Sequence, residues 1–310
     1  MQTYGGNVHY TTSNLSVGFT ALSYSFGKYQ VQPDLKPYNL FYFRGNDNID
    51  ISVDYMFKTK KIKFYGETAM SSNKAVATLN AIRLTPVSYF SLLLLHRYYD
   101  KKYQAFFGNA FGQHSSVQND QEYMVQLDYN SGKNFTTYLR YKYRKKEKNR
   151  TLENESALSV LPYSQQRIRL QLLYGMQSIW VLKTSADGVY YDEGKGKRSL
   201  GWMISQGVGW KPSSLPFQSD IYLAYFHTDD YYSRINSYEK NILYAFSMPS
   251  FYGKGIRLSF SFRWDILKKL SLSAKLGHSY YADRDLIGTD QEEIKGHNKT
   301  DMYMLLRYKF

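Results

Sequence analysis

Apolar and polar residues alternate along the C-terminal part of the chain. Over Gly255–Asp265 every second residue is apolar, and the residues between are charged, hydroxylated or small. The apolar positions are Ile256, Leu258, Phe260, Phe262 and Trp264, and the polar ones are Arg257, Ser259, Ser261, Arg263 and Asp265. This period of two predicts a β-strand, because successive side chains of a strand point to opposite faces.

The same period returns twice before residue 310. Leu270–Gly277 follows a short connection, so it is predicted to form a hairpin with the segment before it. In the last segment, one face carries Met302, Met304, Leu306, Tyr308 and Phe310. A soluble sheet with so apolar a face needs a second layer to cover it, whereas a membrane barrel turns that face to lipid and its polar face to a lumen.

Further strand-like segments bring the total to about 15. They are Thr3–Tyr10, Leu15–Phe26, Asn48–Lys58, Ile62–Met70, Ala75–Leu84, Ser88–Tyr99, Glu122–Asn130, Asn134–Arg144, Arg167–Gly175, Trp180–Tyr191, Ser199–Trp210 and Gln218–Thr228. The predicted fold class is all-β: an antiparallel transmembrane β-barrel of about 14–16 strands, with an incomplete or open barrel as an alternative.

Four connections are less regular. Thr85–Val87 is predicted to be a short turn, and Lys145–Ser164 a loop with a basic tip. Lys101–Asp120 is a long loop that either folds into the barrel or stays exposed. Asp229–Lys254 is either one long loop or a loop that contains a strand at Asn241–Ser247.

The end of the chain resembles a known signal. A terminal strand that finishes on Tyr308 and Phe310 resembles the C-terminal signature of bacterial outer-membrane β-barrels. In those proteins the signature is recognised during barrel assembly, so the resemblance implies the barrel-assembly machinery as a partner and the bacterial outer membrane as the location.

Three longer stretches carry a second resemblance. Gly108–Gln118, Lys183–Gly194 and Tyr238–Gly255 resemble the barrel portion of Bacteroidetes outer-membrane proteins that carry an N-terminal helix-hairpin-helix segment of the competence type. The resemblance runs over most of the 310 residues. The helix-hairpin-helix segment is not among them, so its DNA-binding role is not carried over to this chain.

Composition agrees with a strand-rich chain. The sequence has 32 Tyr and 18 Phe but only 7 Pro, which suits many strands with aromatic edges. No stretch approaches about 18 consecutive apolar residues, so no membrane-spanning helix is predicted. The absence of Cys excludes disulfides and thiolate sites.

Met1–Gly6 leads directly into strand-like sequence, without the basic and apolar regions of an export signal. Either a signal has been removed or the sequence is a fragment with an artificial or miscalled start, and the fragment is the favoured interpretation. We therefore expect residues 1–310 to be a single outer-membrane barrel domain, the C-terminal fragment of a larger protein.

The charge points to anionic partners. A formal net charge of +14 suggests nucleic acid, lipopolysaccharide phosphates or anionic solutes, while solvation of loops and lumen is the alternative. The predicted basic wall of the lumen, a candidate anion path, comprises Arg140, Lys142, Arg144, Arg167, Arg169, Arg257, Arg263, Lys275, Arg307 and Lys309. The other interpretation is that these cations pair across the lumen with Asp50, Asp54, Glu67, Asp128, Asp187, Asp220 and Asp265.

No catalytic site, cofactor or metal site is predicted. The six His residues lack metal-ligand spacing. His114-Ser115-Ser116 and His278-Ser279 bring a base and a nucleophile together in sequence, but adjacency does not make a catalytic triad.

The predicted function is therefore a non-enzymatic pore, or a transport or translocation scaffold, with a basic lumen. The expected partners are outer-membrane lipid and lipopolysaccharide, the assembly machinery, and an anionic solute or DNA. The alternatives are a DNA-binding or DNA-uptake surface protein of competence type, and a secreted multistranded β-protein.

Overall fold

A computed structural model shows a chain built almost entirely of strands. It describes residues 1–310 except 29, 37–38, 109–110, 112–116, 133, 152–157, 177–178, 195, 247 and 289. Long strands form one 15-stranded antiparallel sheet. They are β1 (Gln2–Thr11), β2 (Leu15–Ser25), β3 (Asp47–Lys58), β4 (Ile62–Ser71), β5 (Val76–Val87), β6 (Phe90–Tyr99), β7 (Asp120–Asn130), β8 (Phe135–Thr151), β9 (Leu158–Met176), β10 (Trp180–Asp192), β11 (Arg198–Trp210), β12 (Phe217–Thr228), β15 (Lys254–Leu267), β16 (Leu270–Tyr281) and β19 (Asn298–Tyr308).

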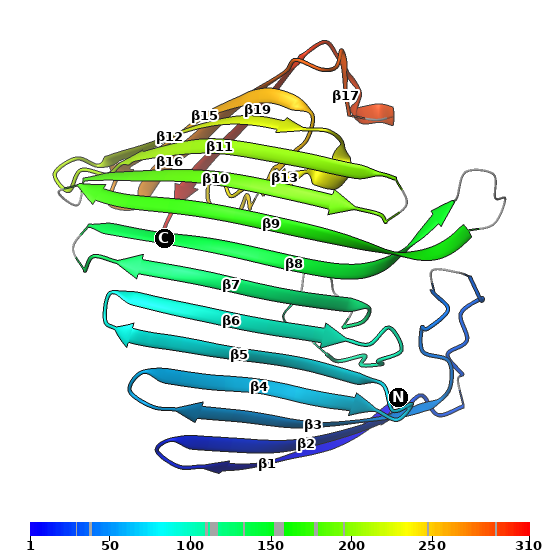
Figure 1. The fold of residues 1–310 in the computed structure, drawn as a ribbon. Helices are drawn as coiled ribbons and strands as arrows, with labels where there is room; N and C mark the ends of the chain where they lie inside the picture. Colours follow the sequence, from blue (N-terminus) through cyan, green and yellow to red (C-terminus); the bar gives the residue numbers. More distant parts are fainter. Residues whose placement is uncertain are drawn as a thin grey trace. The chain divides into compact units, whose positions relative to one another are not determined.

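The sheet follows the chain, each long strand pairing with the next (Figure 1). Two connections carry short elements of their own. Between β12 and β15 lie η2 (Tyr231–Ser233) and the β13–β14 hairpin (Ile235–Asn236 and Ser250–Phe251). Between β16 and β19 lie β17 (Leu286–Ile287), η3 (Asp290–Glu292) and β18 (Ile294–Lys295). The predicted strand number and antiparallel order are confirmed.

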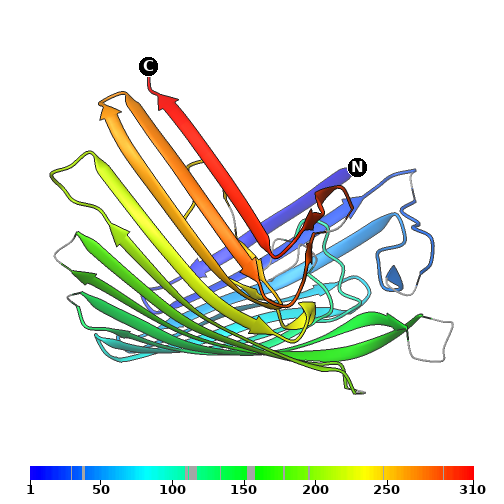
Figure 2. The same cartoon turned by 90° about the horizontal axis from the view of Figure 1, so that it is seen from above.

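The chain divides into two compact units. The first comprises Met1–Leu127, Tyr141–Gln166 and Asp192–Lys197, and the second comprises Asp128–Arg140, Arg167–Tyr191 and Arg198–Phe310. In the second unit, Figure 2 shows β12, β15, β16 and β19 as successive neighbours. No helix in the described part of the chain is long and apolar enough to cross a membrane.

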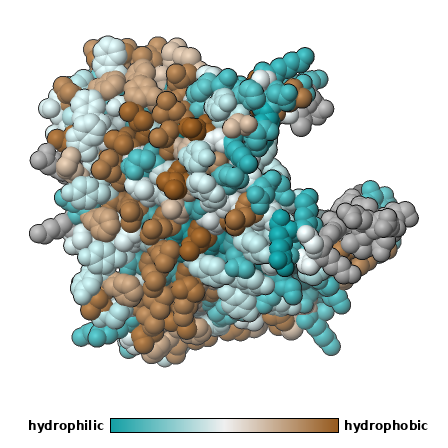
Figure 3. Space-filling view, turned by 45° about the horizontal axis from the view of Figure 1, so that its top comes forward, coloured by the Kyte–Doolittle hydropathy of each residue, from teal (hydrophilic) through white to brown (hydrophobic). Residues whose placement is uncertain are grey.

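Side-chain exposure follows the predicted alternation. On β19, Met302 is 70% exposed and Met304 is 68% exposed, while the neighbouring strand buries Lys275 at 2% on its other face. A soluble sheet buries its apolar side chains and exposes its charged ones, whereas here the apolar row is exposed and the cation is buried. This is the pattern of a strand that lies between lipid and lumen. Brown hydrophobic residues gather over the strands on the face seen in Figure 3. We call the two sides of the sheet the apolar face and the polar face.

The strands at the two ends of the sheet order are more exposed than those between them. β1 is exposed at every residue, and β19 at most of its residues. Each has one neighbour in the sheet order. An edge strand presents unpaired backbone groups, which explains why these two strands differ from the rest.

Two predicted boundaries are wrong. Thr85–Val87 is not a turn: β5 continues to Val87, and the ladder with β6 shifts register between Leu84 and Val87. A bulge of this kind accommodates Pro86, which cannot donate to the ladder.

The predicted loop Lys145–Ser164 is also too long. β8 continues to Thr151 and β9 begins at Leu158, while residues 152–157 lie outside the described part of the chain. Polar side chains indicate contact with water but do not prevent a strand, and these two strands exceed the ten or so residues that a membrane crossing needs.

Candidate functional site

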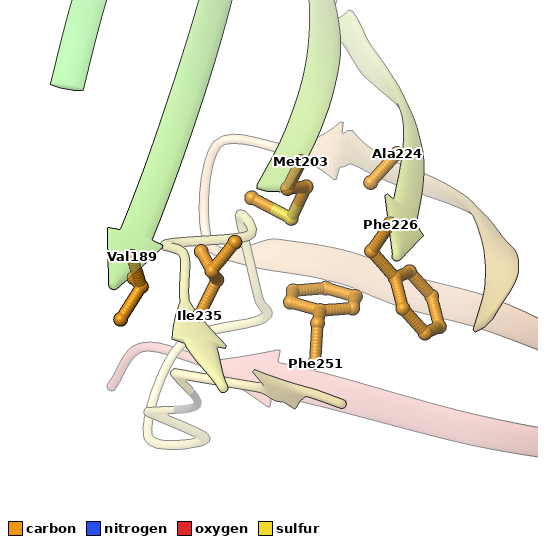
Figure 4. Close-up of a cluster of buried hydrophobic side chains, with 6 residues drawn as sticks. All are labelled: Val189, Met203, Ala224, Phe226, Ile235 and Phe251. Carbon is orange, nitrogen blue, oxygen red and sulfur yellow. The ribbon is translucent and has the colours of Figure 1, made fainter. Parts of the chain in front are cut away.

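The connection between β12 and β15, residues 229–253, lies on the polar face of the second unit. We call it the inner connection. Its Ile235 and Phe251 are buried against the strands, at 1% and 3% exposure. They complete an apolar cluster with Val189 of β10, Met203 of β11, and Ala224 and Phe226 of β12 (Figure 4). Apolar side chains on the polar face are thus buried where the inner connection covers them, which anchors it to the sheet.

A close backbone approach fixes the start of the inner connection. A Cβ atom placed on Gly201 of β11 would lie 2.4 Å from the Ser233 carbonyl oxygen. Ser199 donates to Asp230 at 2.6 Å and lies 2.7 Å from the Ser233 hydroxyl. Only glycine leaves room for η2 at this point, so Gly201 lets the chain turn back onto the sheet.

A buried ion-pair network holds the middle of the inner connection. Glu239, 1% exposed, accepts hydrogen bonds from Arg257 of β15 and Lys275 of β16. Arg257 also donates to Asp301 of β19, with Nη1–Oδ1 at 2.8 Å and Nη2–Oδ2 at 3.1 Å. Its Nη1 also donates to the Ser279 hydroxyl at 3.0 Å. Two cations therefore face two carboxylates, and each buried charge has a partner.

The ion pairs set the charge of Glu239. Burial alone would raise the pKa of this carboxyl, but hydrogen bonds from Arg257 and Lys275 outweigh burial and lower the pKa below its ordinary value of 4.5. Glu239 is therefore ionised at neutral pH.

Two further contacts extend the anchoring. Arg169 of β9 pairs with Asp187 of β10 and donates to the Asn236 carbonyl oxygen at 2.9 Å. Tyr222 donates to the Ser237 hydroxyl at 3.2 Å. The inner connection is thus held by contacts from six strands, β9, β10, β11, β12, β15 and β16.

Beyond Glu239 the inner connection and the sheet enclose a pocket of about 610 Å³. Its floor includes Gln218 and Asp220 of β12 and Arg263 of β15, and its roof is residues 238–246. Lys240 of the roof forms an ion pair with Asp220 of the floor. The pocket opens on the polar face.

The first unit has a network of its own. Arg97 of β6 donates to Asp120 at 2.8 Å and to Glu122 at 3.3 Å, both on β7. Arg144 of β8 binds the same Asp120 through Nε at 2.7 Å and Nη2 at 3.0 Å. Lys142 lies 3.5 Å from Glu122. Three cations surround two carboxylates at positions i and i+2 of β7, which places both acids on one face of the strand.

The Lys101–Asp120 loop also packs on the polar face of its unit. Tyr103 and Val117 are buried against Ala75 and Ala77 of the wall and against Tyr99 of β6. Of the two alternatives for this loop, folding inward or staying exposed, the burial of Tyr103 and Val117 against the strands agrees with the first for these two residues. Residues 109–110 and 112–116, which include His114, Ser115 and Ser116, lie outside the described part of the chain.

The predicted basic residues fall into several settings. Lys142 and Arg144 belong to the first-unit network, and Arg257 and Lys275 hold Glu239. Arg169 pairs with Asp187, as the pairing interpretation expects for that acid. The structure therefore brings these residues together in separate groups within each unit.

The remaining predicted cations are less tightly held. Arg263 pairs with Asp265 at 2.8 Å and is partly exposed, and Arg140 lies over the Tyr138 ring at 4.9 Å. Arg167 is partly buried on β9. Arg307 and Lys309 lie at the end of the chain, where the terminal Tyr308 and Phe310 rings are exposed and meet edge to face with centroids 5.3 Å apart.

Sequence reasoning missed the acids that organise both networks, Asp120, Glu122, Glu239 and Asp301, together with Arg97. Asp120 and Glu122 do show the i, i+2 spacing of a strand face. Nothing local marks Glu239, because its partners are 18 and 36 residues away in sequence.

His278 and Ser279 do not form a catalytic arrangement. His278 is exposed and bonds Thr300 at 2.9 Å, while Ser279 is buried on the other face and accepts from Arg257. Among the described residues, no group of three or more His, Asp or Glu side chains could hold a metal ion.

The comparisons with known proteins bear on the fold. No protein-family model and no curated protein matches the sequence. Among solved structures, the chain is similar to the FrpB iron transporter from Neisseria meningitidis (F3-3 variant), with a TM-score of 0.60 and 11% identity over 99% of this chain and 55% of that one. It is also similar to FpvAI in its complex with pyocin S2, with a TM-score of 0.58 and 11% identity over 99% of this chain and 48% of that one.

The fold is that of the outer-membrane β-barrels. A third structure, P. aeruginosa FpvA bound to heterologous pyoverdines, agrees, with a TM-score of 0.56 and 10% identity over 99% of this chain and 48% of that one. The chain thus spans about half the length of these three structures.

Proposed function

We propose that this chain acts in the outer membrane as a pore or transport scaffold whose polar face forms a basic lumen for small anionic solutes. The observation that carries the proposal is the division of each unit into an exposed apolar face and a polar face with buried charges. Apolar rows of this kind suit lipid, and a charged opposite face suits a water-filled path.

The inner connection supports a selective path over a plain hole. It covers the polar face of β10, β11 and β12 and leaves a pocket lined by charged and aromatic residues. A segment fixed to a wall in this way narrows the path beside it and brings side chains to the solute.

The proposed basic character rests on the charge balance of the chain and on the Lys and Arg side chains of the polar face, among them Arg97, Arg257 and Lys275. The formal net charge of the whole chain is +14. A surplus of Lys and Arg along a path favours anions electrostatically.

Planar-bilayer recording of the refolded 310-residue chain tests this proposal. Under a KCl gradient we expect discrete conductance steps and a reversal potential shifted toward the equilibrium potential of chloride. Conductance indistinguishable from that of empty lipid would refute the pore. A reversal potential shifted toward the equilibrium potential of potassium would refute the basic lumen.

The other partners follow from the same fold. We propose that the apolar face contacts outer-membrane lipid, that Lys and Arg at its margins contact lipopolysaccharide phosphates, and that Tyr308 and Phe310 serve as the signal for the barrel-assembly machinery. The exposed terminal rings support the last of these. We propose no catalytic role.

A second candidate is a DNA-binding or DNA-uptake surface protein, the alternative that comes with the Bacteroidetes resemblance. The net charge of +14 favours it. Retention of duplex DNA by the folded chain would then fall steeply with salt, because each neutralised phosphate releases counterions. Absent or salt-independent retention would exclude this function.

A further inference from the structure

The roof of the 610 Å³ pocket displays aromatic side chains that the protein itself does not use. Tyr244 is 83% exposed and Phe246 is 81% exposed, and both line the pocket. Neither belongs to a membrane-facing strand, since both lie in the inner connection, which folds onto the polar face. Exposing large apolar side chains to water does not stabilise the protein. Their position therefore indicates that they contact a ligand.

The backbone at Tyr244 supports this interpretation. Its φ is +69°, in the left-handed region that aromatic residues rarely adopt. Conformations of this kind are strained and concentrate at active sites and ligand-contacting positions. The surrounding anchors at Ile235, Glu239 and Phe251 hold the segment on the wall.

The charges in the pocket favour an anion. The lining includes three cations, Lys211, Lys240 and Arg263, against one carboxylate, Asp220. Lys240 is paired with Asp220, and Arg263 with Asp265. Lys211 is exposed and has no carboxylate within ion-pair distance in the described part of the chain, so its ammonium is available to a ligand.

The remaining lining is rich in amides and hydroxyls. Gln218, Asn241, Ser261 and Ser273 all line the pocket, and each can both donate and accept hydrogen bonds. Such groups match a ligand with many hydroxyls, whereas a planar aromatic acid has few. Flat apolar rings, neutral hydrogen-bonding groups and an unpaired ammonium in one pocket together match a sugar that carries a carboxylate.

We infer that this pocket is a binding site for an acidic oligosaccharide, with Tyr244 and Phe246 packing against a sugar ring and Lys211 binding its carboxylate. The volume is within the range of about 300–1,000 Å³ of ordinary ligand sites. The inference deepens the proposed function and rests on it for the solute's route to the pocket.

Isothermal titration of the refolded chain in detergent micelles tests this site directly. Three probes separate the contributions: digalacturonate supplies a ring and a carboxylate, cellobiose supplies neutral rings, and 4-hydroxybenzoate supplies an aromatic acid. Saturable binding of digalacturonate in preference to the other two is the expected result. Equal binding of cellobiose would overturn the role of charge, and preferential binding of 4-hydroxybenzoate would overturn the sugar.

Variants locate the site. The double variant Tyr244→Ala with Phe246→Ala and the single variant Lys211→Ala are each expected to weaken digalacturonate binding about tenfold, as loss of stacked aromatic or charged contacts does. Tyr42→Ala and Lys28→Ala remove exposed side chains far away in sequence and serve as matched controls. Unchanged affinity in the pocket variants would overturn the assignment.

Two readouts keep this inference separate from the proposed function. Heat-modifiable gel migration confirms that every variant folds. Binding without bilayer conductance would refute the pore but support the site, whereas anion conductance without saturable digalacturonate binding would refute the site and leave the pore.

Discussion

Arg257 binds the Glu239 carboxylate through two hydrogen bonds: its Nε donates to Oε2, and its Nη2 donates to Oε1 at 2.9 Å. One partner belongs to a sheet strand and the other to the inner connection. This bidentate pair, together with Lys275, ties a long connection to the polar face at a point where water is excluded. The position of the pocket depends on that tie.

Removing Glu239 should release the inner connection. Glu239→Ala removes the carboxylate that pairs with Lys275 and leaves Arg257 with Asp301 as its carboxylate partner, so we expect a loss of about 3–5 kcal/mol in the free energy of unfolding, as for other broken buried pairs. Limited proteolysis should then cut within residues 229–253. Glu293→Ala, at an exposed acid, is the matched control, and equal protease resistance in both variants would contradict the role of Glu239.

The same tie predicts a response to acid. The folded-state pKa of Glu239 is lowered, so the carboxylate stabilises the fold at pH values above the ordinary pKa of 4.5, and this contribution is lost as the pH falls through the folded-state pKa. Protease resistance of residues 229–253 should therefore be constant from neutral pH down to the ordinary pKa of 4.5 and decline as the pH falls further. A decline that begins near pH 6, or one that Glu239→Gln leaves unchanged, would show that another group controls the connection.

Gly201 should tolerate no side chain. A Cβ atom there meets the Ser233 carbonyl oxygen at 2.4 Å, so Gly201→Ala must push η2 away from β11 at a cost of about 1–3 kcal/mol. Gly207 lies on the same strand with its nearest neighbour atoms at 3.7 Å. In a urea titration followed by gel migration, the unfolding midpoint of Gly201→Ala should thus be lower than that of the unsubstituted chain. The midpoint of Gly207→Ala should stay close to it. The reverse order would refute the close approach.

In the first unit, the buried Arg97 should contribute more to stability than the exposed Arg83 of the neighbouring strand β5. Arg97→Met leaves Asp120 with Arg144 alone and Glu122 with Lys142 at 3.5 Å, so we expect a loss of about 3–5 kcal/mol. Arg83→Met replaces an exposed cation of β5 and should change the urea midpoint little. Similar midpoints for the two variants would mean that the buried network contributes no net stability.

The long strands could be predicted because lipid imposes a strict rule. A residue that faces hydrocarbon must be apolar and its neighbours on the strand need not be, so Ile256–Trp264 and Met302–Phe310 show a period of two in the sequence itself. The orientation of both segments is confirmed by their exposure. The polar run Lys145–Thr151 shows no such period, so the pattern does not predict the end of β8.

The site could be predicted only in part. The polar face of β15 and β16 follows from the alternation, which is why Arg257 and Lys275 were candidates. Their partner Glu239 could not be assigned, because a connection of 25 residues has many possible paths and its path is decided by tertiary contacts at Ile235 and Phe251.

A spin-label scan along β15 tests most directly whether the apolar face contacts lipid. The chain has no Cys, so single cysteines at residues 256–264 can be labelled one at a time in the protein reconstituted in lipid. If the apolar face lies against lipid, labels at 256, 258 and 260 will collide mainly with oxygen dissolved in the bilayer, and those at 257, 259 and 261 will not. The opposite result is that neither oxygen nor a water-soluble relaxation agent reaches the labels at 256, 258 and 260. That result would place the apolar face against protein and contradict its contact with lipid.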